Sequence, residues 1–245
     1  VPTHTKEERA RLQKAFGYTY EDFRTSILPM ALNGAESIGA MGIDTPLAVL
    51  SNRHQPLFNY FKQLFAQVTN PPIDSIREKI VTSTTVYLGK DGNVLEEKPE
   101  NCKNLKINNP ILTNTDLLKI KNMKVEGFKV ETIPITYYKN TSIEKAIDHI
   151  FVEVDRAHRE GANIIILSDR GVDENHVAIP SLLAVGAVQH YLVQTKKRTS
   201  MAVILESGEP RDVHHFATLL GYGASAINPY LAQESIQELI DLNML

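Results

Sequence analysis

The sequence predicts an α/β fold: an incomplete (β/α) barrel-like parallel sheet with flanking helices and a β-hairpin. From about residue 125 onward, short apolar runs alternate with longer segments of helical periodicity. The connections between them are short, which is typical of parallel strands joined by right-handed helical crossovers. This part has about 120 residues, whereas a complete eight-fold barrel needs about 250, so we expect the barrel to be incomplete.

The composition is that of an ordinary globular protein, with 42% hydrophobic and 22% charged residues among 245. The formal net charge of −3 gives no strong attraction to nucleic acid or to an anionic membrane, so we expect neither as a partner. No segment approaches the ~18 apolar residues of a membrane span, and no signal-peptide pattern opens the chain. The lone Cys102 excludes an internal disulfide framework and fits a reducing, intracellular setting.

Two short helices are expected at the start of the chain. Thr5 and Glu8 have the spacing of a capping box, which predicts a first helix that ends near Gly17. Residues 19–32 favour a second helix that is ended by Pro29, because proline restricts the residue before it.

The next stretch predicts a loop followed by a helix. Residues 39–55 are rich in glycine and turn formers, so we expect loop with short extended pieces. Residues 56–72 favour a helix that Pro56 opens and that the Asn-Pro-Pro sequence at 70–72 ends. The apolar stripe of this helix consists of Leu57, Phe61, Leu64, Phe65 and Val68.

A β-hairpin is expected over residues 79–97, with Asp91-Gly92 at its turn. Residues 99–123 are polar and irregular. They favour either a surface excursion, through which a partner protein could bind, or the seam between two parts of the chain. These parts are an N-terminal helical and loop part with the hairpin, residues 1–124, and a degenerate β/α barrel part, residues 125–245.

The C-terminal half predicts four strands, each followed by a helix. The first helix has Ser142 as its N-cap and Gly161 as its end signal. The strands are expected at residues 129–137, 163–169, 200–207 and 224–229. The helices are expected at residues 142–161, 179–195, 210–223 and 231–245.

Charged side chains gather at the predicted carboxyl ends of these strands, where functional residues of parallel α/β proteins lie. We expect Asp169, Arg170, Glu206, Arg211 and His214 to meet there. One interpretation is the acid–base site of an independent small α/β enzyme. The other is an ion-pair and capping network that fixes the loops, and we favour it because such networks form without doing chemistry.

The adjacent His214 and His215 do not predict a metal site. Neighbours on a helix point about 100° apart, whereas two zinc-binding histidines on a helix want four-residue spacing. One histidine is expected to pack and the other to be exposed or hydrogen-bonded. Cys102 has no histidine nearby in sequence, so we expect no nucleophile there. No glycine loop joins a strand to a helix in the order that a nucleotide-binding motif requires.

Several long strings of this chain occur in one known family. They include LPMALNGAESIGAMGIDTPLAVLS, LFNYFKQLFAQVTNPPIDSIREK, IPSLLAVGAVQHYLV and ESGEPRDVHHFATLLGYGASAINPYLA. In this order they resemble the central domain of glutamate synthase from about residue 14 to residue 232. That domain is a reduced relative of an FMN barrel, which agrees with the incomplete strand–helix repeat. The chain begins at Val1 rather than at methionine, and we expect a processed chain or a segment of a longer protein.

The resemblance implies a larger enzyme around this domain. In that family a glutaminase domain with a catalytic cysteine precedes the central domain, and a barrel with FMN and an iron–sulfur cluster follows it. Ammonia from glutamine passes to 2-oxoglutarate, and FMN reduces the resulting imine to glutamate. The expected partners are therefore the glutaminase and FMN-barrel domains of the same polypeptide, together with ferredoxin or an electron-donor subunit. The expected compartment is the cytoplasm or a plastid, and no cofactor is expected in this domain itself.

The resemblance also implies a role for two motifs of this chain. The family's Met-Gly-x-Asp-Thr-Pro and Val-Thr-Asn-Pro-Pro motifs lie near the ammonia tunnel. Ile43 stands where family members often have Asn or Asp. Threonine hydroxyls and backbone carbonyls can hydrogen-bond ammonia without placing a full charge beside it. The alternative is that these residues only form turns and fill gaps. The expected tunnel-lining residues are Met41, Asp44, Thr45, Thr69 and Asn70.

Overall fold

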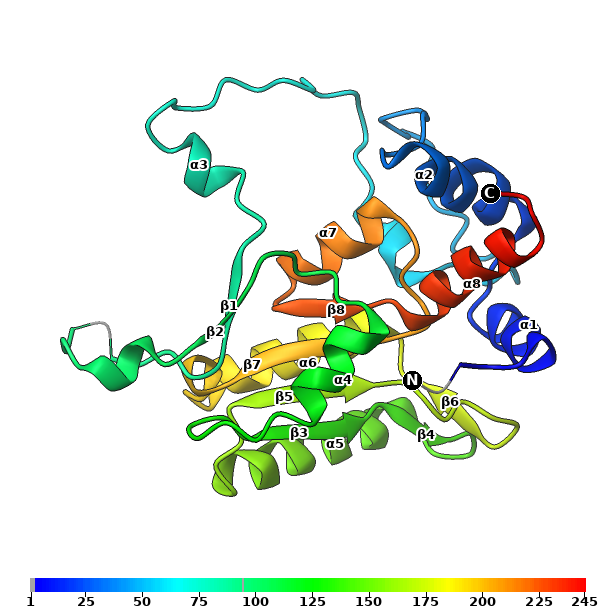
Figure 1. Cartoon of the computed structure of the whole chain (residues 1–245). Helices are drawn as coiled ribbons and strands as arrows, with labels where there is room; N and C mark the ends of the chain where they lie inside the picture. The colour runs from blue at the N-terminus through cyan, green and yellow to red at the C-terminus, as the bar shows by residue number, and fades with distance from the viewer. Residues whose placement is uncertain (1–2, 94) are drawn as a thin grey trace.

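A computed structural model describes residues 3–93 and 95–245. Its centre is a four-stranded parallel sheet in the order β3-β5-β7-β8, and helices separate successive strands (Figure 1). Within the described residues this sheet does not close into a barrel, so the predicted incomplete barrel-like α/β fold is confirmed. The strands are β3 (Val130–Pro134), β5 (Ile164–Ser168), β7 (Ala202–Glu206) and β8 (Ala226–Asn228). The helices are α5 (Ile143–Arg159), α6 (Ser181–Gln194), α7 (Val213–Gly221) and α8 (Tyr230–Asp241).

The apolar runs and helix-end residues that the sequence analysis used have their predicted roles in these strands and helices. Every residue of β5 and β7 is buried, as expected of continuous apolar strands in the middle of a parallel sheet. Ser142 caps α5 by accepting a hydrogen bond from the Lys145 backbone N–H. Gly161 follows the end of α5 with φ +85°, a conformation that favours glycine.

The two faces of the sheet have different covers. Ile165 and Leu167 of β5 point to the face that α5 and α6 cover. Ile164 and Ile166 point to the opposite face, which packs against α4 (Asn114–Lys121) and against Leu88. Alternate residues of a strand face opposite ways, so one apolar run supplies two cores. Phe58, from the N-terminal part, joins the core with α5 and α6. The boundary near residue 124 remains a prediction.

The first predicted strand, over residues 129–137, is two strands in the structure. β3 ends at Pro134, and β4 (Thr136–Tyr138) pairs antiparallel with β6 (His176–Ala178). Ile135 lies between them, where its N–H donates to the Ser168 carbonyl. The strand β6 has no counterpart among the predicted elements, because its pairing depends on a segment about 40 residues earlier in the chain.

The capping box at Thr5 and Glu8 is confirmed and begins α1 (Lys6–Ala15). The prediction that Pro29 ends the second helix is wrong. The chain enters through a π-helical segment, η1 (Asp22–Ile27), and Pro29 then lies in the first turn of α2 (Leu28–Asn33). Residues 20–33 are helical without a break, so Pro29 does not open a new helix. It follows π-helical turns, where the Leu28 N–H donates to the Phe23 carbonyl, so the ordinary i→i−4 ladder that an interior proline interrupts is already replaced there.

The predicted helix over residues 56–72 is also wrong. Only a short 3₁₀ segment, η2 (Leu57–Phe61), forms after Pro56. Phe58 is fully buried, whereas Leu64, Phe65 and Val68 of the predicted stripe are exposed. An amphipathic helix gains most of its stability by burying its apolar face, and these residues have no such surface to pack on among the described residues.

The hairpin prediction is wrong about the partner strand and the turn. β1 (Val86–Leu88) forms an antiparallel pair, but with β2 (Leu105–Ile107) instead of the residues just after Asp91-Gly92. Asn101 donates to the Asn93 and Glu96 carbonyls, so these described residues are tied to the segment before β2 instead of forming a second strand beside β1. The predicted second strand includes Val94, which lies outside the described residues.

Residues 99–123 are more regular than the sequence predicts. They contain η3 (Pro99–Cys102), β2 and α4. Thr113 caps α4 by accepting from the Asp116 N–H, and Leu117 and Ile120 are buried against the sheet. Leu117 and Ile120 have i, i+3 spacing and lie on one face of this helix, but the many polar residues around them make that apolar pattern weak in the sequence. Within the part of the chain that the structure describes, no helix is both long and apolar enough to cross a membrane.

Candidate functional site

The last residues of three neighbouring strands, Ser168, Glu206 and Asn228, lie side by side in register and are buried. Glu206 accepts hydrogen bonds from Arg170 Nε at 2.6 Å, Lys121 Nζ at 2.7 Å and Ser168 Oγ at 2.7 Å. Burial acts to raise the pKa of Glu206, but these hydrogen bonds outweigh it and hold that pKa below its ordinary value. Glu206 is therefore an ionised carboxylate between two cations.

Asp169 forms a second network just beyond the strand. Its carboxyl accepts from Ser207 Oγ at 2.5 Å, the Gly208 N–H at 3.1 Å and the Tyr230 hydroxyl at 2.9 Å. Burial raises the pKa of Asp169 to about 7, although the three donors act in the opposite direction. The Arg170 guanidinium lies 4.0 Å from the centre of the Tyr230 ring and so connects this network to Glu206.

Arg211 connects the β/α part to the start of the chain. Its guanidinium donates to Asp22 Oδ2 at 3.1 Å, to the Phe16 carbonyl at 3.1 Å and to the Gly17 carbonyl at 2.9 Å. It also lies 4.3 Å from the centre of the Tyr18 ring. The side chain is buried, so each of these bonds replaces water that the guanidinium has lost.

The two histidines have different surroundings, as the sequence predicts. The ring of His215 is buried, stacks on Phe58 at 4.3 Å and accepts from the Arg211 N–H at its Nδ1. Burial lowers the pKa of His215 to about 4, so the ring is neutral near pH 7. His214 turns away and donates from Nε2 to the Phe58 carbonyl at 3.0 Å.

The five predicted strand-end residues therefore do not form one cluster. Arg170 contacts Glu206 directly, and Asp169 is joined to them through Tyr230. Arg211 and His214 instead face the N-terminal segments. Both oxygens of each of the two strand-end carboxyls accept hydrogen bonds from the chain itself. These carboxyl oxygens are therefore paired within the chain, whereas an acid–base catalyst needs an oxygen that faces a substrate.

Sequence reasoning missed two members of these networks. Lys121 lies at the end of α4, in the segment expected to be irregular. Its i, i+4 spacing from Leu117 places both on one helix face, and this spacing was the sequence signal that Lys121 points toward the sheet. Asp22 lies 189 positions from Arg211, so no local pattern connects them. Long-range ion pairs of this kind become visible only in the folded chain.

The expected tunnel residues lie in two segments that touch each other. Met41 Sδ accepts a hydrogen bond from the Gln67 N–H at 3.1 Å, and the Ile43 N–H donates to the Gln63 carbonyl at 3.0 Å. The Met-Gly-x-Asp-Thr-Pro motif therefore lies against the residues that precede the Val-Thr-Asn-Pro-Pro motif. The other four expected residues, Asp44, Thr45, Thr69 and Asn70, are exposed to solvent.

A cavity of about 1070 Å³ adjoins the first of these segments. Met41, Ile43 and Gln63 contribute to its lining, and so do His54, Arg211 and His214. It lies between the early loops and the start of α7. The cavity therefore places one predicted tunnel residue beside two members of the predicted strand-end set.

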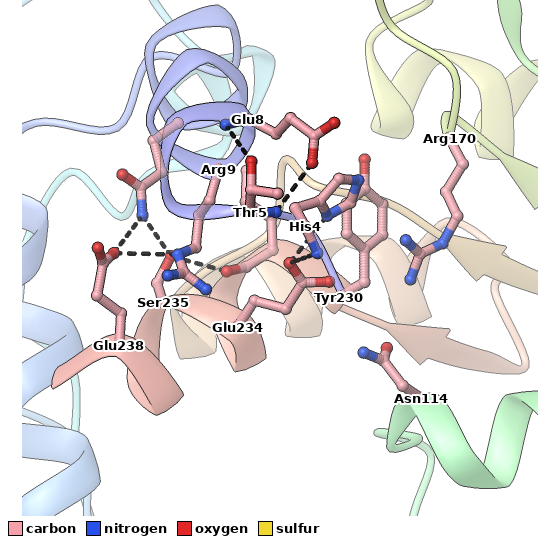
Figure 2. Close-up of polar contacts among 12 residues, drawn as sticks. His4, Thr5, Glu8, Arg9, Asn114, Arg170, Tyr230, Glu234, Ser235 and Glu238 are labelled. Atoms are coloured by element: carbon pink, nitrogen blue, oxygen red, sulfur yellow. Dashed lines mark hydrogen bonds and ion pairs between the residues drawn. The ribbon is translucent and has the colours of Figure 1, made fainter. Parts of the chain in front are cut away.

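A polar contact surface holds α1 on α8 (Figure 2). Glu234 Oε2 pairs with His4 Nδ1 at 2.8 Å, and Arg9 Nε donates to Glu238 at 3.1 Å. Glu234 is buried, and its Oε1 has no hydrogen-bond partner among residues 3–93 and 95–245. Figure 2 shows Arg170 on the other side of the Tyr230 ring from α1, so this surface continues toward the strand ends.

Residues 3–93 and 95–245 contain no group of three or more His, Cys, Asp or Glu side chains that could hold a metal ion. An open parallel β/α sheet whose strand ends carry a self-paired charge network defines an α/β protein of incomplete, barrel-like architecture. A family profile described as "Glutamate synthase central domain" matches residues 11–245. The chain belongs to this family.

Full-length relatives support the same assignment. The glutamate synthase [NADPH] large chain of Bacillus subtilis is 46% identical over 229 residues, covering 94% of this chain and 15% of the relative. Ferredoxin-dependent glutamate synthase 2 of Synechocystis is 44% identical over 230 residues, covering 92% and 15%. The chloroplastic ferredoxin-dependent glutamate synthase of Oryza sativa is 43% identical over 232 residues, covering 93% and 14%. The chain thus spans about one seventh of these relatives and corresponds to their central domain.

Proposed function

We propose that this chain is the connecting domain of a glutamate synthase and is not catalytic alone. It links a glutaminase domain to an FMN synthase domain and lines part of the tunnel that carries ammonia between them. The whole enzyme makes glutamate from glutamine and 2-oxoglutarate in the cytoplasm or in a plastid. Its electron donor is a reduced pyridine nucleotide or ferredoxin, the two kinds for which the relatives are named.

The observation that carries this proposal is an extended arm, residues 62–85, between η2 and β1. It runs away from the sheet and carries the short helix α3 (Glu78–Val81) (Figure 1). Its large apolar side chains are exposed, and Ile76 and Ile80 are 88% and 77% accessible. A soluble domain rarely leaves so many large apolar side chains of one segment in water, so the arm is expected to be covered by a partner.

The rest of the same polypeptide is the partner that fits. The relatives are about seven times longer than the matched segment, so further domains lie next to it in those chains. The chain has one cysteine, Cys102, and cannot supply the set of thiolates that holds an iron–sulfur cluster. The proposal therefore places the cluster, and the FMN beside it, in a neighbouring domain.

The strand-end networks support a scaffold role for the β/α part. Glu206 is fully paired with Lys121 and Arg170, and Arg211 ties α7 to residues 16–22. Such long-range bonds hold the N-terminal segments and the strand ends of the sheet at fixed positions relative to each other. A rigid spacer between two active centres needs this property.

An acid–base site at Asp169, Glu206, Arg211 and His214 is the second candidate. One observation favours it: Arg211 and His214 line the cavity of about 1070 Å³. The closed hydrogen bonding of both carboxyls speaks against it. Turnover of any substrate by the chain without its neighbouring domains would support this candidate over the connecting role.

The tunnel role is tested in the full-length enzyme with glutamine that carries ¹⁵N in its amide. The reaction is run in excess unlabelled ammonium, and the ¹⁵N content of the newly formed amino group is measured. Retained label is expected, because nitrogen inside a tunnel does not mix with the solvent. Label diluted to the bulk ratio would contradict the proposal.

The docking role is tested by hydrogen exchange. Amides of the arm are expected to exchange quickly in the chain alone and slowly in the full-length enzyme, because the other domains cover them. The buried strands β5 and β7 serve as the internal control and are expected to be protected in both. Equal exchange of the arm in both samples would refute the docking.

A further inference from the structure

Gly42 lies where two segments of the chain come closest. A Cβ added at this residue would be 2.6 Å from the Phe65 carbonyl carbon, 2.7 Å from its Cα and 2.9 Å from the Ala66 nitrogen. All three are backbone atoms, which cannot turn aside as a flexible side chain would. Ordinary contact begins near 3.4 Å, so any side chain at Gly42 would push the two segments apart.

The requirement for glycine here is one of space and not of backbone conformation. Gly42 is not among the glycines with positive φ, so an alanine could adopt its backbone angles. Gly39, three residues earlier in the same loop, also has an ordinary φ, and a Cβ there would meet no atom within 4 Å. The two glycines therefore differ only in whether a neighbouring segment lies against them.

The contact at Gly42 is flanked by two hydrogen bonds. The Gln67 N–H donates to Met41 Sδ on one side, and the Ile43 N–H donates to the Gln63 carbonyl on the other. Residues 61–70 are otherwise exposed, so no buried core fixes their distance from the loop. The close backbone contact and these two bonds set that distance.

We propose that Gly42 is a positioning residue that sets the spacing between the two segments that bear the tunnel motifs. This inference rests on the proposed tunnel function and adds a residue to it. Gly42 lies next to Met41 in one segment and against Phe65 in the other. Thr69 and Asn70 lie only four and five positions after Phe65, so the contact also sets how far these two lie from Met41. A wall made of two independent loops encloses a small molecule only while the gap between them stays closed.

The test uses the full-length enzyme with Gly42→Ala and, as the matched control, Gly39→Ala. Three rates are compared: glutamine hydrolysis, glutamate formation from added ammonium, and transfer of ¹⁵N from the glutamine amide to glutamate. Gly42→Ala is expected to lower the retained ¹⁵N about twofold or more while leaving the first two rates near wild type, because overpacking shifts backbone locally. Gly39→Ala is expected to match wild type in all three.

A second measurement guards against misfolding of the first variant. Hydrogen exchange of β5 and β7 in Gly42→Ala is expected to match wild type, whereas the amides of Ile43 and Gln67, which donate the two flanking bonds, are expected to exchange faster than in wild type or in Gly39→Ala. Full retention of label in a folded Gly42→Ala enzyme would overturn the role of this contact while leaving the tunnel itself supported. Loss of label already in the wild-type enzyme would instead overturn the tunnel.

Discussion

Arg211 Nε lies 3.1 Å from Asp22 Oδ2 and joins the start of α7 to a segment 189 positions earlier. The same guanidinium satisfies the Phe16 and Gly17 carbonyls. This side chain therefore adds to the α1–α8 contacts that hold the N-terminal helices on the β/α part. The Arg211 side chain is buried, so removing its guanidinium would leave the acceptors of these hydrogen bonds without a donor and lower the free energy of unfolding.

Replacing this side chain is expected to destabilise the chain. Arg211→Met should lower the free energy of unfolding by about 2–4 kcal/mol, because it leaves two backbone carbonyls and Asp22 without their donor. Urea unfolding measures the change. Asp22→Asn is the control and should cost less, since it retains the carbonyl partners of Arg211. Equal losses in the two variants would show that only the ion pair matters.

Asp169 is expected to make stability fall as pH rises. Its folded-state pKa of about 7 lies above the ordinary value of about 3.9, so the folded chain holds this proton more tightly than the unfolded chain. The contribution is fully present below pH ~4 and is lost as pH rises to ~7, at a slope of up to about 1.4 kcal/mol per pH unit. Asp169→Asn has no such titration. The free energy of unfolding of wild type minus that of the variant should therefore decline across this window, and a flat difference would be contrary evidence.

His215 is expected to act in the opposite direction. Its folded-state pKa of about 4 lies below the ordinary value of about 6.5, so the unfolded chain binds the proton more tightly. Its stabilising contribution is present above pH ~6.5 and is lost as pH falls toward ~4. His215→Gln keeps an acceptor for the Arg211 N–H but does not titrate. The difference between wild type and this variant in unfolding free energy should rise between these pH values, opposite in sign to that for Asp169→Asn.

Arg170 is expected to be irreplaceable by lysine. Its planar guanidinium both donates to Glu206 and lies over the Tyr230 ring, two contacts that an ammonium cannot make together. Arg170→Lys should lower the unfolding free energy by about 1–2 kcal/mol in urea, nearly as much as Arg170→Ala. A fully stable lysine variant would indicate that the charge alone suffices.

The arm should respond to charge only when its neighbours are present. In the chain alone, Ile76→Asp with Ile80→Asp is expected to change the unfolding free energy by no more than about 0.5 kcal/mol, because both side chains are exposed. In the full-length enzyme the same pair should lower the thermal midpoint and the retention of ¹⁵N. Identical behaviour of the two samples would remove the arm from the domain interface.

The sequence predicts elements well where local signals agree with the tertiary environment. The Ser142 cap, the apolar runs of β5 and β7 and Gly161 all indicate the same β/α order that the structure has. It fails over residues 56–72 because an apolar stripe forms a helix only where a surface buries it. It fails at Asp91-Gly92 because a turn signal does not determine which strand β1 pairs with.

The candidate sites divide in the same way. The sequence places polar residues at the strand ends, and its resemblance to glutamate synthase points to Met41 and Thr69 as residues of interest. The sequence does not predict the partners of these residues. The contact of Gly42 with Phe65 and the bond from Lys121 to Glu206 join segments that are distant in sequence.

By itself, the sequence determined the β/α order, the helix caps and the family, because each depends on neighbouring residues or on long continuous strings. Only the tertiary structure decided which charges pair, where the early loops touch and which apolar side chains remain exposed. Those outcomes depend on distances between atoms of remote segments, and chain folding sets such distances through the packing of the whole domain.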